Sequence, residues 1–430
     1  MMRVLAVQLF LSLLLFIARE GRAQALDPLL KLEQAWSIGP EDFRKAAADL
    51  PFQWTSNAKD SARAAKPGMT LLSLPVVECV ARFQNEKLTE LTAVFYARGD
   101  AGSISKDTFD TLVRRCAETF NTFTNLKFTP RPKESGAAVK ADGIFWQNDK
   151  ARYVLEYSVT KEVKSRNIDF RAEFVRLTVT APEKRASILN TTSSTRQKFS
   201  GPAHLKKDAK TGEVVIPDVP MVDQGQKGYC VVAATERVLR YYSIDVDANE
   251  LAQVANSDAE RGTSLEGMFA ALKKIATRLR VRVREIEGMD VKGILDLVKD
   301  YNREAKRSKN ELIPDPGNRI DVGAIYNRMQ FEVLREARTR NKSDLTRFQR
   351  TLQGTIDQGI PLLWSVQLGL SPEPGIPQSA GGHMRLLIGY NLSTQEVLFS
   401  DSWGAGHELK RMPMADAWAI TTGLMLVEPL

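Results

Sequence analysis

Cys230 is the residue best suited to nucleophilic chemistry, because it lies where a glycine-rich turn meets an apolar helical pattern. The stretch VPMVDQGQKGYCVVAATERVLRYY covers residues 219–242. A thiol at a helix N-terminus faces free backbone N–H groups and the positive end of the helix dipole. Both favour the thiolate, the reactive form of cysteine. The alternative is a thiol that only fills the core, which is the commoner role of a single cysteine.

A nucleophilic thiol needs a base, usually histidine, and the chain has only three histidines. His204 lies in a linker-like segment and His407 lies in a loop, whereas His383 opens the apolar run MRLLIGY. We expect His383 at a strand edge, where the small residue Gly382 leaves the imidazole ring accessible. The alternative is a strand-start histidine that is satisfied by a backbone carbonyl.

Asp401 is the candidate for the third group, which fixes the tautomer of the base. It follows the run EVLFS, and a turn near residues 391–395 lies about midway between positions 383 and 401. An antiparallel hairpin around that turn would bring His383 and Asp401 side by side. Alternatively, the carboxylate accepts turn hydrogen bonds from the N–H groups of Trp403 or Gly404.

Gln224 is the candidate donor for a developing oxyanion. It precedes Cys230 by six residues, across a loop that contains Gly225 and Gly228. Its side-chain amide and the backbone N–H of Cys230 could form one oxyanion hole. A surface glutamine is the alternative. Each of these residues alone is a weak signal, and the ordered set of Gln, Cys, His and Asp is specific.

The elements that must position these residues divide the chain into two α+β parts. The first part has four strand-like runs, at 69–83, 88–98, 151–163 and 170–182, and one amphipathic helix at 105–123. It predicts a small antiparallel sheet with a covering helix. The second part has helical patterns followed by strand-like runs, which indicates an α+β arrangement of a helical part and an antiparallel sheet. These patterns cover residues 230–242, 264–280, 291–311, 347–359, 361–368, 383–391 and 395–403.

The length of 430 residues predicts two domains. Residues 1–25 are typical of a secretory signal, because Arg3 precedes an apolar run too short to span a membrane and Ala23-Gln24-Ala25 offers a cleavage pattern. We therefore expect a secreted or periplasmic (cell-envelope) protein, and a membrane location only if the signal is retained. The predicted boundaries are 26–182 for an N-terminal domain of unknown role, 183–204 for a polar linker and 205–430 for a catalytic domain.

Composition excludes several other classes. The net charge is +8, but no dense Lys/Arg stripe is present, so nucleic acid is a poor candidate partner. No Cys/His cluster has metal-ligand spacing and no glycine-rich nucleotide motif follows a strand, so we expect neither metal nor cofactor. An odd cysteine count in an exported protein indicates a free thiol or an intermolecular disulfide partner. Cys79 and Cys116 could form a disulfide or be reduced core residues, and either choice leaves Cys230 free.

The segments DQGQKGYC, GGHMRLLIGY and DSWG resemble the papain-like cysteine peptidase superfamily, and its peptidase C39-like branch in particular. The resemblance covers about residues 201–430. It implies that Cys230 attacks the scissile carbonyl, that His383 is the base and that Asp401 orients it. It also implies that Gln224 helps to form the oxyanion hole.

The same resemblance implies that Trp403 shields the His–Asp pair from water, and we place Gly228 and Gly382 beside the substrate. The sequence departs from papain at two positions near the nucleophile. Lys227 stands where papain has a second cysteine, and Val231 replaces the tryptophan after the nucleophile. These changes remove a disulfide and alter the substrate wall, but they remove no catalytic group.

The sequence thus predicts an exported thiol hydrolase, a cysteine peptidase that acts on proteins or peptides. Two alternatives remain: a papain-fold binding or scaffold protein without turnover, and an acyl transferase or deamidase with the same triad. The N-terminal domain could be inhibitory, docking or structural. The oligomeric state is left open.

Overall fold

A computed structural model gives the fold of the chain. It describes residues 24–31, 35–131, 138–139, 141–164, 167–182, 199–225, 228–244, 246–257, 263–315, 317, 320–371, 373 and 380–430. Most of the predicted signal segment (1–23), residues 183–198 of the predicted linker and Lys227 lie outside the described residues. Within the described part, no helix is long and apolar enough to cross a membrane.

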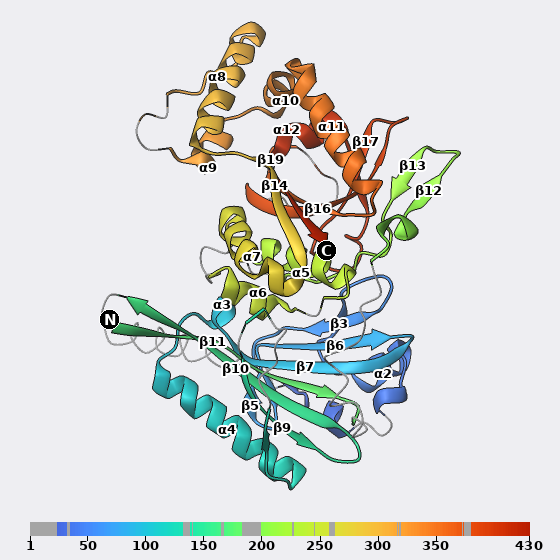
Figure 1. The fold of residues 1–430 in the computed structure, drawn as a ribbon, viewed down its shortest axis with the longest axis vertical. Coiled ribbons are helices and arrows are strands. Elements are labelled where there is room, and N and C mark those ends of the chain that lie inside the picture. The colour runs from blue at the N-terminus through green and yellow to red at the C-terminus, as the bar shows by residue number, and fades with distance from the viewer. Residues whose placement is uncertain are drawn as a thin grey trace, which may run out of the picture.

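The described chain is α+β with antiparallel sheets, as the sequence predicts (Figure 1). The N-terminal half, residues 24–182, contains an eight-stranded antiparallel sheet in the order β2-β3-β6-β7-β11-β10-β9-β8. Its strands are β2 (Gln53–Trp54), β3 (Ser61–Ala64), β6 (Glu78–Gln84), β7 (Lys87–Ala97), β8 (Thr129–Pro130), β9 (Asp142–Gln147), β10 (Arg152–Lys164) and β11 (Asn167–Thr180). This sheet is larger than the small one that the sequence predicts.

Short elements surround this sheet. A separate three-stranded sheet contains β1 (Gln24–Ala25), β4 (Met69–Leu71) and β5 (Leu74–Pro75), with β1 parallel to β4. The predicted strand-like run 69–83 is therefore split, because Leu72 and Ser73 adopt positive φ angles and turn the chain. The other short elements are η1 (Asp27–Lys31), η2 (Ala35–Ser37), α2 (Pro40–Ala46) and α3 (Arg98–Ala101).

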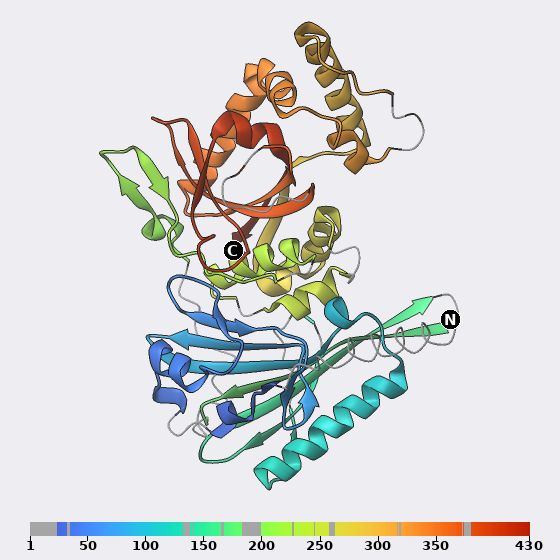
Figure 2. The ribbon, with the colours of Figure 1, turned by 180° about the vertical axis from the view of Figure 1, so that it is seen from behind.

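Helix α4 (Lys106–Thr124) lies along the N-terminal sheet, opposite the C-terminal half (Figure 2). It begins where the Ser105 side chain accepts a hydrogen bond from the Thr108 N–H, and its buried face includes Phe109, Cys116 and Phe120. Cys79 of β6 and Cys116 are free thiols in the N-terminal hydrophobic core. Both cysteines are therefore core residues in this structure.

The C-terminal half, residues 199–430, has a second antiparallel sheet in the order β12-β13-β16-β15-β19-β14, with β17 and β18 continuing from β16. Its strands are β12 (Lys206–Asp208), β13 (Glu213–Val215), β14 (Val281–Gly288), β15 (Leu362–Leu368), β16 (Gly381–Asn391), β17 (Glu396–Ser400), β18 (Lys410–Pro413) and β19 (Thr421–Pro429). Its helices are η3 (Gly201–His204), α5 (Cys230–Tyr241), α6 (Ala248–Val254), α7 (Leu265–Leu279), α8 (Val291–Ser308), α9 (Val322–Tyr326), α10 (Phe331–Arg340), α11 (Lys342–Ile356) and α12 (Met414–Ile420).

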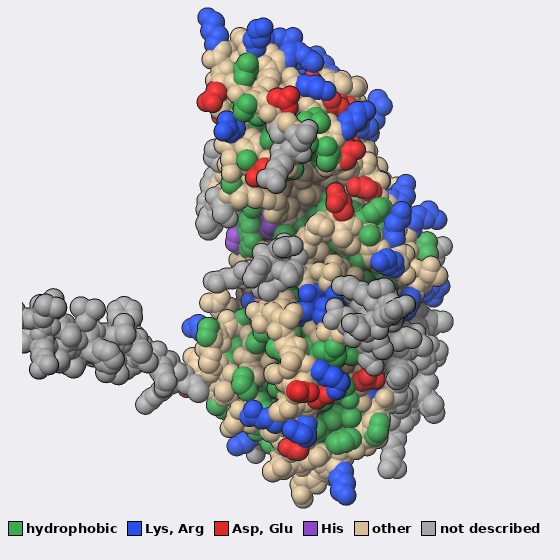
Figure 3. Space-filling model, turned by 90° about the vertical axis from the view of Figure 1, so that its left-hand side faces the viewer, with side chains coloured by type: hydrophobic (Ala, Val, Ile, Leu, Met, Phe, Trp, Pro, Cys, Tyr) green, Lys and Arg blue, Asp and Glu red, His purple; other side chains and the backbone are tan. Residues whose placement is uncertain are grey.

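Helix α5 is the central element of this half. It packs against β16 on one side and faces the N-terminal half on the other, so ten of its twelve residues are buried. A helix that is apolar on most sides is stable only when it is enclosed. By contrast, α8, α9 and α10 have a hydrophobic cluster of their own and project away from the sheet (Figure 1). Lys and Arg side chains gather at that end of the molecule on the face in Figure 3.

Polar side chains connect the two halves at several points. Their two large hydrophobic clusters are distinct. Arg176 of β11 pairs with Glu250 of α6 at 2.9 Å, and Arg98 of α3 donates to the Asn256 side chain at 3.3 Å. The side chains of Arg176, Glu250 and Arg98 are buried, whereas Asn256 is exposed. Buried charged side chains therefore form part of the interface.

Candidate active site

Cys230 is the first residue of α5, as the sequence predicts. The residue before it, Tyr229, provides no side-chain cap to the helix. The first-turn N–H groups of α5 consequently stay directed toward the thiol end of the helix, where they stabilise negative charge. Cys230 itself is half-buried, so its sulfur lies at the border between core and surface.

His383 and Asp401 are brought together by the β16–β17 hairpin. Strand β16 carries His383, and Asp401 directly follows β17 after the turn that the sequence places near residue 391. The His383 Nε2 atom lies 2.9 Å from Asp401 Oδ1. The histidine is 6% exposed and the aspartate is fully buried. Burial excludes competing water and holds the imidazole in one orientation.

The Cys230 thiol and the His383 ring lie close enough that each shifts the pKa of the other. Because Nε2 is engaged by Asp401, Nδ1 is the nitrogen left for the thiol. Burial alone would raise the pKa of Cys230, but the hydrogen bond and charge of His383 outweigh it and lower that pKa below 9.0. Burial would likewise lower the pKa of His383, but hydrogen bonds to Asp401 and Cys230 raise it above 6.5. Both shifts favour a thiolate–imidazolium pair.

Three cationic or donor groups surround the Asp401 carboxylate. Besides His383, Arg385 Nε lies 3.0 Å from Oδ1 and Lys410 Nζ lies 3.1 Å from Oδ2. Burial opposes ionisation, yet the His383 hydrogen bond and the charges of Arg385 and Lys410 hold the pKa of Asp401 well below its usual range. Asp401 is therefore an ionised carboxylate in a site without water contact.

Trp403 covers the His383 ring. The two ring centroids are 4.5 Å apart and the planes are within 15° of parallel. Lys410 Nζ lies 5.1 Å from the centroid of the same indole. Histidine side chains come to the surface on the face in Figure 3, at the level where the two halves meet. The indole therefore covers one face of the His383 ring.

Gln224 lies on the loop that leads to Cys230. Its backbone N–H donates to the Ser402 carbonyl at 2.8 Å, which ties this loop to the residues after Asp401. Its side-chain Oε1 is buried and accepts no hydrogen bond from the described residues. Gly228 is exposed beside the nucleophile, and a Cβ atom added at Gly382 would meet open space. Both glycines thus leave room next to the candidate nucleophile and base.

Sequence reasoning missed Arg385, Arg237 and Lys410. Arg385 is fully buried. The sequence feature that could have revealed it is its position two residues after His383, which places both side chains on the same face of the strand. Arg237 lies two helical turns after Cys230 and donates to the Asp401 backbone carbonyl at 2.9 Å. Lys410 carries no local signal, because only the tertiary fold brings it to Asp401.

The two remaining histidines lie elsewhere in the structure. His204 stacks on Phe199 at 5.4 Å between ring centroids and is half-buried rather than exposed. His407 stays in a loop, where its Nδ1 lies 2.6 Å from Lys410 Nζ. Burial and the Lys410 charge lower the pKa of His407. Among the three histidines, the one that interacts with Cys230 in the described part of the chain is His383.

Comparison with known proteins concerns mainly the C-terminal half. Residues 216–425 match the model of the Peptidase_C39 like family, a range that contains Gln224, Cys230, His383 and Asp401. Among solved structures, the chain is similar to xylellain, a cysteine protease from Xylella fastidiosa, at 14% sequence identity and a TM-score of 0.27. That similarity covers 55% of this chain and 91% of xylellain. No curated protein sequence matches the chain.

Proposed function

We propose that this protein is an exported cysteine peptidase that hydrolyses amide bonds of proteins or peptides, a function supported by the match of residues 216–425 to the Peptidase_C39 like family. One observation supports the proposal: Cys230 begins a helix and interacts with His383, whose Nε2 atom lies 2.9 Å from Asp401 Oδ1. A nucleophile, a base and an orienting group in that order are what acyl transfer through a thiol requires.

The proposed reaction starts from the thiolate–imidazolium pair. The Cys230 sulfur attacks the carbonyl carbon, and the carbonyl electron pair moves onto oxygen. The Cys230 backbone N–H and the Gln224 amide donate to that oxyanion. As the oxyanion collapses, the C–N bond breaks and His383 gives its Nδ1 proton to the leaving amine. The product of this half-reaction is a thioester on Cys230.

Hydrolysis of the thioester restores the enzyme. His383 removes a proton from water, and the resulting hydroxide adds to the thioester carbonyl. The C–S bond then breaks, the acid product leaves and the thiolate is again paired with imidazolium. During acylation and hydrolysis, Asp401 keeps its negative charge and accepts the hydrogen bond from the Nε2–H of His383. Trp403 limits the access of water to that hydrogen bond.

A peptide library tests the proposed activity. Wild-type protein is incubated with mixed-sequence peptides and the products are identified by mass spectrometry, with Cys230→Ala as the matched control. Cleavage that the wild type performs and the variant does not supports the peptidase. Products joined to an added amine would identify a transferase, and conversion of glutamine to glutamate would identify a deamidase. Intact peptides in both samples would contradict catalysis and favour a binding or scaffold protein.

Export rests on the sequence of residues 1–25. Cleavage after Ala25 would make Leu26, whose side chain is buried in the N-terminal core, the first residue of the mature chain. N-terminal sequencing of protein recovered from the envelope fraction or the medium tests this step. A chain that keeps residues 1–25 and sediments with membranes would contradict it.

A further inference from the structure

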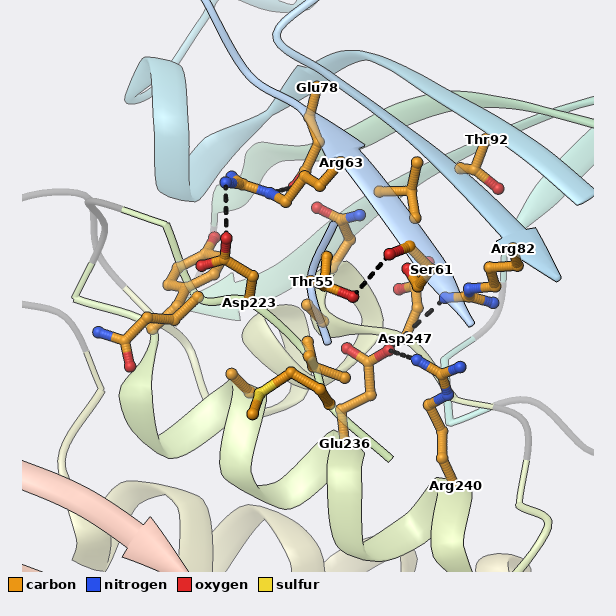
Figure 4. A pocket seen from close by; sticks show the side chains of 18 of the residues that line it. Thr55, Ser61, Arg63, Glu78, Arg82, Thr92, Asp223, Glu236, Arg240 and Asp247 are labelled. Atoms are coloured by element: carbon orange, nitrogen blue, oxygen red, sulfur yellow. Dashed lines mark hydrogen bonds and ion pairs between the residues drawn. The ribbon is translucent and has the colours of Figure 1, made fainter. Parts of the chain in front are cut away.

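A cavity of about 70 Å³ lies between the two halves, beside the loop that carries Gln224. Strands β3, β6 and β7 form one wall, and the residues before Cys230 together with α5 form the other (Figure 4). The N-terminal half therefore reaches the loops of the candidate active site and contacts them at three places.

The first contact is between Arg63 of β3 and the turn around Gln224. Arg63 pairs with Glu78 of β6, and its Nη1 lies 3.9 Å from Asp223 Oδ2 (Figure 4). Asp223 in turn accepts a 2.8 Å hydrogen bond from the Gly225 N–H. Gly225 has a φ angle of +65°, and a Cβ atom there would lie only 2.6 Å from Arg63 Nη2. The guanidinium thus lies directly against the turn.

The second contact involves the residue before the nucleophile. The Tyr229 hydroxyl packs against Gly99 of α3, where an added Cβ atom would lie 1.4 Å from it. Tyr229 is 4% exposed, so its ring is enclosed where the two halves meet. The N-terminal half therefore contacts the loop that leads to Cys230 at two points, Gly225 and Tyr229.

The third contact is on the opposite loop, which follows Asp401. Asn57 donates its backbone N–H to Glu408 at 2.6 Å and its side-chain amide to the same carboxylate at 3.3 Å. Glu408 also accepts from the Gly406 N–H at 2.8 Å. The N-terminal half therefore touches the loops on both sides of the candidate site.

We propose that the N-terminal half is a positioning platform for the catalytic loops, with Arg63 as the positioning residue for the oxyanion turn. The inference rests on the proposed function. Arg63 touches no substrate and acts through Asp223 and Gly225 on the Gln224 amide and the Cys230 N–H. In this role the N-terminal half must stay attached for the enzyme to be active. It would therefore not be an inhibitory pro-segment that is removed to release activity.

The test compares Arg63→Met with Arg82→Met in the full-length protein. Arg82 is the matched control, because it lines the same cavity and its ion pairs in the described part of the chain are with Glu90 and Glu236 rather than with Asp223. p-Nitrophenyl acetate measures acylation of the thiol, which needs the oxyanion hole. Iodoacetamide measures thiolate reactivity, which needs only the pair of Cys230 and His383.

The platform predicts a selective loss. Arg63→Met should lower kcat for p-nitrophenol release about 10-fold or more at unchanged KM, short of the roughly 10²–10³-fold loss on removing a whole oxyanion donor. Its iodoacetamide rate should stay within about twofold of wild type, and Arg63→Lys should recover part of kcat. Arg63→Met and Asp223→Asn should also be non-additive, whereas Arg82→Met and Asp223→Asn should be additive.

Two results would overturn the platform while leaving the proposed function intact. One is wild-type turnover by Arg63→Met. The other is a parallel loss of acylation and alkylation in both Arg63→Met and Arg82→Met, which would show a general structural defect. A wild-type protein whose Cys230 neither releases p-nitrophenol nor reacts rapidly with iodoacetamide overturns the proposed function and this inference together.

Discussion

Asp401 shows most clearly how single residues set the chemistry of this site. A carboxylate next to a histidine normally raises the histidine pKa. Here Arg385 and Lys410 share the same carboxylate and offset part of that effect. The cations keep Asp401 ionised while limiting how basic His383 becomes, so the pH range of the thiolate–imidazolium pair depends on them.

Lys410→Met tests this balance. Without the positive charge of Lys410, proton binding to the nearby Cys230 and His383 side chains becomes more favourable. The pKa values of both groups should therefore rise. The acid and basic limbs of the pH–rate profile should therefore move together to higher pH, measured as kcat/KM for p-nitrophenyl acetate. Arg411→Met is the control, because Arg411 pairs with Glu213 on the outside of the same strand. An unshifted profile in Lys410→Met would contradict the role of this cation.

Arg385→Met tests the structural side of the same cluster. Its guanidinium is fully buried between Asp401 and Glu373, and it lies 4.6 Å from the Phe399 ring centroid. Removing one partner of a buried ion pair typically costs about 3–5 kcal/mol. We expect the free energy of unfolding in urea to fall by about that amount. A loss below about 1 kcal/mol would show that the remaining partners compensate.

At the scale of elements, the site depends on the N-terminus of α5 and the β16–β17 hairpin. Both could be predicted from the sequence, because a glycine-rich turn before an apolar run and a short turn between two strand patterns are local signals. The amphipathic helix α4 is a third such case. Strand ends and extra strands were harder, since β14 and β19 pair only with partners far away in the chain.

The polar surroundings of the site could not be predicted in the same way. Lys410 lies on β18 and reaches Asp401 only after the sheet forms. Arg63 and Gly99 come from the other half of the chain, and the sequence contains no sign that they contact the loop before Cys230. Periodicity reports which face of an element is apolar, but it carries no information on which distant charges meet.

Gly99→Ala tests the contact between α3 and the residue before the nucleophile. The new methyl group would overlap the Tyr229 hydroxyl, so Tyr229 must move and the start of α5 with it. Overpacking of this kind costs about 1–3 kcal/mol, and we also expect a lower kcat. Gly354→Ala in α11 is the control, because its Cβ would meet open space and helix propensity favours alanine by up to about 1 kcal/mol. Equal stability of the two variants would contradict the contact.

At the scale of the whole molecule, buried ion pairs in the N-terminal sheet continue into the contact with the C-terminal half. Arg176 pairs with Glu156 of β10 at 2.9 Å and with Glu250 of α6 at 2.9 Å. Burial would raise the pKa of Glu156, but the charges and hydrogen bonds of Arg176 and Arg131 lower it below 4.5. The stability that these pairs contribute therefore depends on ionised carboxylates.

The sign of the pH effect follows from that lowered pKa. A carboxyl with a depressed folded-state pKa contributes stability above its unfolded pKa and loses it as pH falls through the folded value. The contribution of Glu156 to the free energy of unfolding should be constant above about pH 6 and should decline below about pH 4.5. Urea unfolding between pH 7 and pH 3 measures it, and Glu156→Gln should decline less steeply. Identical slopes for both proteins would contradict this assignment.

The reactivity of the Cys230 thiol can be measured by its rate of alkylation with iodoacetamide at pH 6.5. Burial raises the pKa of Cys79 and of Cys116 to about 12, so these two thiols are inert controls within the same chain. Only about 1% of an ordinary thiol is ionised at that pH. We predict that wild-type Cys230 reacts at least about 10-fold faster than the same cysteine in His383→Ala and in urea-unfolded protein. Equal rates in all three samples would contradict the account.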